Sequence, residues 1–151
     1  MDTQALVRPI EILLVEDNNG DILLIQEALE EGKLNSNLSV TKNGMDGLDF
    51  LHRRGIYKNA PTPDLILLDM NLPKKNGKEV LADIKSDEEL KVIPVVILTS
   101  SQAEQDILAS YRLNANCYIT KPVDFEKFID VINSIENFWF SVVKLPSQQG
   151  Q

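Results

Sequence analysis

Residues of types that bind metal ions and phosphate follow four apolar runs of the chain. Glu16 and Asp17 follow the first run, Asp69 and Thr99 follow two later ones, and Lys121 comes shortly after a fourth. Carboxylates brought close together raise one another's pKa unless a cation lies among them. Magnesium prefers oxygen ligands and commonly binds one or two carboxylates together with a phosphate oxygen. Asp17 and Asp69, with Glu16 acting directly or through water, therefore suit Mg²⁺.

The other two residues complete a site that could accept a phosphoryl group. The ammonium group of Lys121 offers a point charge to one phosphoryl oxygen, and the Thr99 hydroxyl can donate a hydrogen bond to another. A carboxylate oxygen of Asp69 can attack phosphorus. Taken singly, an Asp after a strand is more often a helix cap, and Lys before Pro usually marks a turn. Their shared place after predicted strands favours one common site.

Strand and helix patterns alternate along the chain and indicate how these residues are positioned. Short, nearly continuous apolar runs are typical of strands buried on both faces of a parallel sheet. The expected strands are residues 10–15, 38–41, 65–68, 95–98 and 117–119, of which the second and the last have the weaker pattern.

Helical signals lie between these strands. Apolar residues recur at helical spacing from Ile22 to Leu29 and from Val80 to Ile84. Ser101 to Glu104 predicts a capping box that opens a further helix, and Asp124 is placed to cap the last one. Strands that alternate with helices predict a doubly wound α/β domain, in which ligands bind at the carboxyl ends of the strands.

Composition narrows the class of protein. The 151 residues suit one domain, and 43% hydrophobic with 25% charged residues is typical of a globular chain. A formal charge of -8 disfavours nucleic acid as a partner. No stretch is apolar enough for a signal peptide or membrane span. The single cysteine, Cys117, and the single histidine, His52, exclude multi-thiolate and two-histidine metal sites and fit a cytoplasmic location.

Four segments together resemble the receiver domain of two-component response regulators, over about Pro9 to Phe138. They are Leu13–Asn18, Leu67–Pro73, Leu98–Ser100 and Tyr118–Pro122. The resemblance implies a flavodoxin-like, five-stranded parallel sheet in the order 2-1-3-4-5. We expect residues 1–8 to be a tail, 9–140 the receiver domain and 141–151 a C-terminal extension.

The resemblance also implies a role for each residue of the site. Asp69 would accept a phosphoryl group from a sensor histidine kinase, Lys121 would bind the phosphoryl group, and Thr99 and Tyr118 would form the switch pair. A cis bond before Pro122 is expected, since proline makes the cis form accessible. The metal ligands for Mg²⁺ would be Glu16, Asp17, Asp69 and the backbone carbonyl of Asn71. Such a protein is a signalling phosphoacceptor and not an enzyme, beyond magnesium-dependent phosphorylation and dephosphorylation of itself.

Two features depart from the commonest receiver pattern. Glu16 stands where many members have Asp, and we expect metal binding to survive the extra methylene. Residues 53–63 form an additional loop before the phosphoacceptor strand. A loop of this kind, with no effector domain after the receiver, is similar to response regulators that serve bacterial phytochromes, although other stand-alone receivers share it. The downstream partner is not indicated by the sequence.

The last predicted helix has more apolar surface than one core contact requires. Its apolar residues spread over roughly 200° of the helical wheel. Val131, Ile135, Phe138 and Val142 lie along one edge at four-three-four spacing, which suits packing against a second helix. We expect a homodimer through this face; the alternative is that residues 138–140 fold back on their own domain.

Other functions remain open. A receiver-like module could bind partners without phosphorylation. A magnesium-dependent phosphatase with an Asp nucleophile, as in the haloacid dehalogenase family, fits less well because Asn71 is an amide where those enzymes carry a second Asp as general acid. A flavin carrier is disfavoured because Glu16 and Asp17 would repel its phosphate, and a nucleotide hydrolase lacks its glycine-rich phosphate loop.

Overall fold

Five parallel strands form one sheet. The structure is a computed structural model and describes residues 8–32, 35–110, 113, 115 and 117–134. The strands lie in the spatial order β2-β1-β3-β4-β5, and each neighbouring pair is parallel. They are β1 (Ile10–Val15), β2 (Ser36–Thr41), β3 (Leu65–Asp69), β4 (Val95–Thr99) and β5 (Cys117–Thr120). This confirms the predicted doubly wound α/β fold and the strand order that the resemblance implies.

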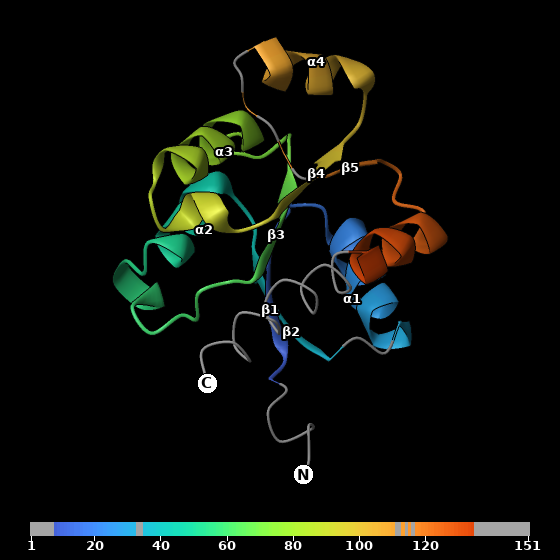
Figure 1. The fold of residues 1–151 in the computed structure, drawn as a ribbon, viewed down its shortest axis with the longest axis horizontal. Coiled ribbons are helices and arrows are strands. Elements are labelled where there is room, and N and C mark those ends of the chain that lie inside the picture. Colours follow the sequence, from blue (N-terminus) through green and yellow to red (C-terminus); the bar gives the residue numbers. More distant parts are fainter. Residues whose placement is uncertain (1–7, 33–34, 111–112, 114, 116, 135–151) are drawn as a thin grey trace, which may run out of the picture.

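Helices cover both faces of the sheet. In Figure 1, α1 and the helix over residues 125–134 lie on one side, and α2 and α3 lie on the other. The α4 helix lies beyond the carboxyl end of β4. The labelled helices are α1 (Asn19–Glu31), α2 (Gly44–Leu51), α3 (Gly77–Ser86) and α4 (Gln102–Ser110), with short 3-10 turns η2 (Gly55–Tyr57) and η3 (Leu90–Val92).

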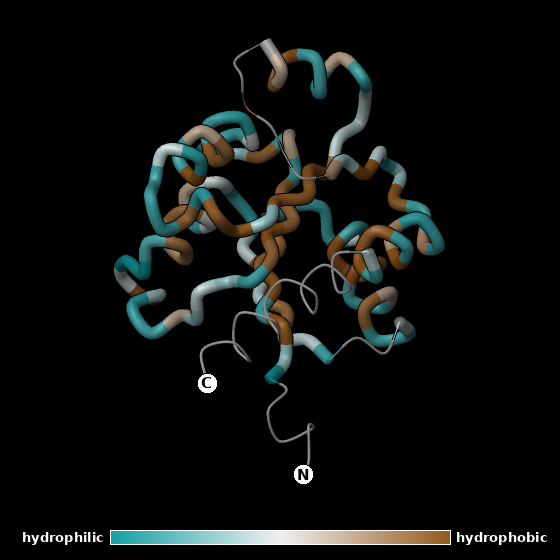
Figure 2. The backbone as a smooth tube through the Cα atoms, viewed as in Figure 1, coloured by the Kyte–Doolittle hydropathy of each residue, from teal (hydrophilic) through white to brown (hydrophobic). Residues whose placement is uncertain are grey.

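The core has two apolar clusters, one on each face. Successive residues of β3 alternate between them: Leu65 and Leu67 pack with α1 and with Phe128, whereas Ile66 and Leu68 pack on the α2 and α3 side. These four β3 side chains are at most 2% exposed. Figure 2 shows the central strands as the most hydrophobic part of the chain. The continuous apolar runs are thus explained, because a strand covered on both faces has no polar side, and each buried Leu contributes about 1.5–3 kcal/mol.

Short polar side chains define where the helices begin. The side chains of Asn18, Asn43 and Asn76 accept the backbone N–H of a residue three positions on, at 2.8–2.9 Å. Asp124 does the same for Lys127 at 3.0 Å, as predicted. These caps satisfy N–H groups that have no partner within the helix.

The predicted capping box at Ser101 forms only in part. Ser101 Oγ accepts the N–H of Glu104 at 3.3 Å, but the Glu104 carboxylate does not return to the Ser101 N–H. It accepts instead the N–H of Ser100 at 2.8 Å and the hydroxyl of Thr99 at 2.7 Å. The expectation was therefore wrong for half of the motif, because these two donors compete for the carboxylate.

The amino end of the sheet is tied by one carboxylate. Asp64 accepts two hydrogen bonds from the Arg8 guanidinium, at 2.6 and 2.8 Å, and one from the N–H of Glu11 at 2.9 Å. Its own N–H donates to the Glu11 carbonyl at 2.7 Å. The starts of β1 and β3 are thereby joined at the end opposite to the predicted site.

Candidate phosphoryl and metal site

The carboxyl ends of the strands bring the predicted residues to one edge of the sheet. Glu16 and Asp17 follow β1, Asp69 ends β3, Thr99 ends β4, and Lys121 follows β5. One carboxylate oxygen from each of Glu16, Asp17 and Asp69 lies within 4.8 Å of the other two. Glu16 and Asp69 are buried, while Asp17 is exposed. The acidic cluster predicted from the sequence is therefore present.

Lys121 lies among the carboxylates. Its Nζ is 2.9 Å from Glu16 Oε1, 3.1 Å from Asp69 Oδ1 and 3.3 Å from Asp21 Oδ2. Burial opposes protonation of this ammonium, but the Glu16 and Asp69 carboxylates outweigh it and raise the pKa of Lys121. The backbone N–H of Lys121 donates to the Thr99 carbonyl at 2.7 Å, and the peptide bond before Pro122 is cis, as the resemblance implies. Lys121 is thus a charged group beside the Asp69 carboxylate.

Glu16 has an environment that suits a cation. The pKa of Glu16 is raised to about 7, first by burial and then by the neighbouring Asp69, while the ammonium of Lys121 and the N–H of Asn18 act in the opposite direction. Glu16 Oε1 is fully enclosed, and its contact with Lys121 Nζ is an ion pair without the alignment of a hydrogen bond. A buried oxygen with spare lone pairs beside two further carboxylates fits a hard divalent cation.

The loop after β3 approaches α3 so closely that it requires glycine. A Cβ on Gly77 would lie 2.5 Å from the Asp69 carbonyl oxygen and 2.6 Å from Met70 Cα. The Gly77 N–H donates to the Met70 carbonyl at 3.0 Å. The N–H of Asn71 donates to Asp69 Oδ1 at 3.3 Å, which orients the Asp69 carboxylate. Gly77 is a supporting residue that motif reasoning missed, since its role depends on a contact across the loop.

The predicted switch residues lie on adjacent strands. Thr99 is fully buried, and its hydroxyl is 2.7 Å from Glu104 Oε1 and 2.9 Å from the Ser101 carbonyl. Tyr118 is half-buried on β5 and packs against the apolar cluster on the α2 and α3 side. Glu104 was not among the predicted site residues, because a capping box already accounted for it.

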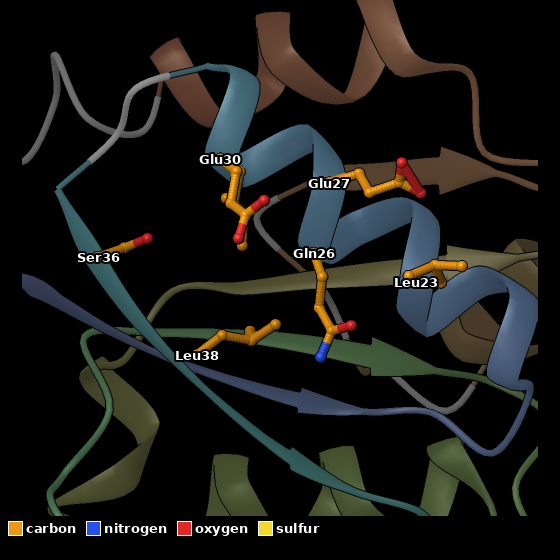
Figure 3. A pocket seen from close by; sticks show the side chains of 7 residues that line it. Leu23, Gln26, Glu27, Glu30, Ser36 and Leu38 are labelled. Carbon is orange, nitrogen blue, oxygen red and sulfur yellow. The ribbon is translucent and has the colours of Figure 1, made fainter.

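A surface pocket lies elsewhere, between α1 and the edge strand β2. Figure 3 shows its lining residues, with Gln26 and Glu30 of α1 pointing toward the strand that carries Ser36 and Leu38. Among the residues that the structure describes, the lining includes none of those predicted to bind metal or phosphate. The acidic cluster and this pocket are therefore separate features.

The predicted dimer face is described only in part. Val131 is half-buried and packs against the apolar cluster on the α1 side of its own sheet. Ile135, Phe138 and Val142 lie outside the described residues. The homodimer stays a prediction.

Comparison with known proteins agrees with this geometry. Residues 12–133 match the family model described as the response regulator receiver domain. The response regulator Rcp1 of Synechocystis sp. is 47% identical over 139 residues, which cover 92% of this chain and 95% of Rcp1. The chain belongs to the response regulator receiver domain family, whose members are signalling proteins of two-component systems.

Solved structures of related proteins have the same fold. The Mn²⁺-bound form of Rcp1 matches with a TM-score of 0.74 at 46% identity, covering 89% of this chain and 96% of that one. The phosphorylated cyanobacterial phytochrome response regulator RcpA matches with a TM-score of 0.75 at 50% identity, covering 88% and 95%. The bacteriophytochrome response regulator AtBRR matches with a TM-score of 0.76 at 43% identity, covering 84% and 92%. The chain is thus related to phytochrome-linked response regulators.

No helix in the described part of the chain is long and apolar enough to cross a membrane.

Proposed function

We propose that this chain is a single-domain response regulator that accepts a phosphoryl group on Asp69 from the phosphohistidine of a sensor kinase. The observation that carries the proposal is the environment of the Asp69 carboxylate. It is 2% exposed, its Oδ1 lies 3.1 Å from Lys121 Nζ, and it shares a cluster with Glu16 and Asp17. A nucleophilic carboxylate, an ammonium group and a cation site are the parts that phosphoryl transfer to Asp requires.

The residues divide the work of the transfer. An Asp69 carboxylate oxygen forms a bond to phosphorus as the P–N bond to the kinase histidine breaks, and that electron pair stays on the imidazole nitrogen. The Lys121 ammonium pairs with one phosphoryl oxygen, and the Thr99 hydroxyl donates to another. In hydrolysis, a water oxygen bonds to phosphorus, the P–O bond to Asp69 breaks, and the carboxylate returns.

Mg²⁺ is the proposed cofactor. Glu16, Asp17, Asp69 and the carbonyl of Asn71 would hold it, and when bound it supplies positive charge that neutralises the phosphoryl oxygens. The buried, under-bonded Oε1 of Glu16 supports this assignment. The Mn²⁺-bound form of Rcp1 is consistent with a divalent cation in a relative.

We further propose a phytochrome-type kinase as the donor, in the cytoplasm. The supporting observations are the 50% identity to RcpA and the 45% identity to the bacteriophytochrome response regulator RtBRR. Phosphorylation would let Thr99 bind the phosphoryl group and Tyr118 turn inward, so that the surface of α4, β5 and the helix over 125–134 changes. Output would pass by noncovalent contact, including the predicted homodimer, from a receiver domain spanning residues 9–140.

Intact mass after incubation with acetyl phosphate and Mg²⁺ tests the proposal. We expect a gain of one phosphoryl group that hydroxylamine removes, and no gain in Asp69→Asn or with a chelator. Asp130→Asn, on the exposed face of the last helix, is the matched control and should behave as the parent. If acetyl phosphate gives no gain, transfer from a phosphorylated histidine kinase must be measured. Failure there as well would favour an interaction module that acts without phosphorylation, whereas steady release of phosphate from small phosphoesters would favour a phosphatase.

A further inference from the structure

We propose that Glu104 is a positioning residue that holds the hydroxyl proton of Thr99 until a phosphoryl group competes for it. The inference rests on the proposed function, because it concerns the hydrogen bond that must break before Thr99 can donate to a phosphoryl group on Asp69. Thr99 Oγ1 lies 2.7 Å from Glu104 Oε1, and the Thr99 side chain is fully buried. A threonine hydroxyl carries one proton, so it cannot donate to Glu104 and to a phosphoryl oxygen together.

Of the two oxygens that can accept a hydrogen bond from the Thr99 hydroxyl, the Glu104 carboxylate is the stronger acceptor. The Ser101 carbonyl also lies within reach, at 2.9 Å, but it is neutral. A hydroxyl that donates to a carboxylate forms a shorter and stronger bond than one that donates to a neutral oxygen. Glu104 is therefore the partner that the phosphoryl group has to displace.

Glu104 is itself held in place by several donors. Its carboxylate accepts the N–H of Ser100 at 2.8 Å, the hydroxyl of Ser100 at 3.0 Å and the side-chain amide of Asn71 at 2.7 Å. Burial works against ionisation of this carboxyl, yet hydrogen bonds led by that from Thr99 outweigh it and lower the pKa of Glu104. The Glu104 carboxylate is thus an anion held in one position at neutral pH. We expect it to keep its hydrogen bond with Thr99 until another acceptor competes for the hydroxyl proton.

These contacts join three parts of the molecule at one side chain. Glu104 lies in the first turn of α4, Thr99 and Ser100 belong to the end of β4 and the loop that follows, and Asn71 belongs to the loop after β3. In Figure 1, α4 lies beyond the carboxyl end of β4, next to the loop that this network spans. If the Thr99 hydroxyl turned from Glu104 to a phosphoryl oxygen, the first turn of α4 would lose one of its hydrogen bonds to β4. Phosphorylation of Asp69 would thereby act on α4 through Thr99 and Glu104.

Binding of beryllofluoride in the presence of Mg²⁺ tests the inference, because its adduct with a carboxylate imitates an acyl phosphate. We expect Glu104→Ala to bind beryllofluoride at least about threefold more tightly than the parent, since the competing acceptor is gone. Glu104→Gln should show a smaller gain, because its amide oxygen still accepts from Thr99. Asp106→Asn removes a carboxylate from the exposed side of the same helix and should bind as the parent does.

A double-mutant cycle separates positioning of Thr99 from simple stabilisation of α4. If Glu104 acts through Thr99, Glu104→Ala will not change beryllofluoride affinity in a Thr99→Ala background. An equal gain in both backgrounds would overturn the inference, and so would an affinity of Glu104→Ala that equals or falls below that of the parent. If Glu104→Ala does not fold, the same cycle with Glu104→Gln decides.

The outcomes also separate this inference from the proposed function. A parent chain that takes up neither beryllofluoride nor a phosphoryl group contradicts the proposed function, and the inference fails with it. If the parent takes up both and Glu104 substitution leaves the beryllofluoride affinity unchanged, only the role of Glu104 is contradicted, and the proposed function stands.

Discussion

Lys121 Nζ lies 3.1 Å from Asp69 Oδ1, so the carboxylate that we propose as the phosphoacceptor has an ion-pair partner in the unphosphorylated chain. The same ammonium is 2.9 Å from Glu16, which is fully buried. The Lys121 ammonium therefore neutralises part of the charge of the buried pair Glu16 and Asp69 when no metal ion is bound. Phosphorylation would redirect this charge to a phosphoryl oxygen without moving it far.

Replacement of Lys121 by Met should destabilise the metal-free protein. Asp69 would lose its counter-charge, and Glu16, whose pKa is already about 7, would take up a proton. We therefore expect a loss of about 3 kcal/mol at pH 7, the lower end of the range for a broken buried pair. That end applies because the Lys121 side chain is 19% exposed. Urea unfolding measures the change, and Lys127→Met, on the exposed side of the last helix, is the control. Equal losses in the two variants would contradict the ion-pair interpretation.

Mg²⁺ should stabilise the folded chain through the acidic cluster. Above the dissociation constant, each tenfold increase in Mg²⁺ concentration should add about 1.4 kcal/mol to the free energy of unfolding. Asp17→Asn removes an exposed ligand of the cluster and should weaken this dependence. Thermal unfolding across a Mg²⁺ series gives the measurement, with Asp130→Asn as the control for charge. A series in which Asp17→Asn tracks the parent would exclude Asp17 as a ligand.

The Glu104 network predicts a pH dependence of stability. The folded state lowers the pKa of Glu104 below its ordinary value of 4.5, so the unfolded chain takes up the proton more readily. The stabilisation is complete above pH 4.5 and is lost as the pH falls through the folded-state pKa. The difference in unfolding free energy between the parent and Glu104→Gln should therefore shrink on acidification below about pH 4.5. A difference that stays constant from neutral to acidic pH would show that the network does not favour the ionised form.

Gly77 should tolerate no side chain. A Cβ there would contact the backbone at Asp69 and Met70, so Gly77→Ala must displace the loop after β3 or the start of α3. We expect a loss of about 1–3 kcal/mol in stability together with slower phosphorylation by acetyl phosphate. Gly20→Ala is the comparison, because its Cβ would meet only the movable side chain of Asn18, at 3.2 Å. If both alanine variants behave alike, the close approach at Gly77 is not limiting.

Sedimentation tests the predicted dimer. Ile135→Glu places a charge within the proposed face of Val131, Ile135, Phe138 and Val142 and should shift the chain to the monomer mass. Lys127→Glu changes the charge at an exposed position of the helix over residues 125–134 and should leave the mass unchanged. A common mass for the parent and Ile135→Glu would remove this helix from the interface.

The sequence predicted the sheet well because burial on both faces leaves a clear pattern. The runs at residues 10–15, 65–68 and 95–98 match β1, β3 and β4 to within one residue. The pattern of α2 was weaker, since Gly44 and Gly47 are poor helix formers and its place followed mainly from the alternation of elements.

The acidic cluster could also be predicted, whereas the network around Glu104 could not. Residues that follow parallel strands meet at one edge, so Glu16, Asp17, Asp69 and Lys121 were brought together by topology alone. Glu104 fits a local capping pattern equally well, and only three-dimensional contacts show that Thr99 and Asn71 are its partners. Long-range hydrogen bonds between loops leave no periodic signal in a sequence.

The bidentate contact of Arg8 with Asp64 has a practical consequence for reporter design. Because this contact and the Glu11 hydrogen bonds join the start of β1 to that of β3, a fluorophore attached at Arg8 would lie at the end of the sheet opposite to the proposed site. A probe at Asp106 would lie on the exposed side of α4, the helix whose first turn is hydrogen-bonded to Thr99 through Glu104. If phosphorylation displaces α4 as we propose, dyes at these two positions would report the change in distance between α4 and the opposite end of the sheet.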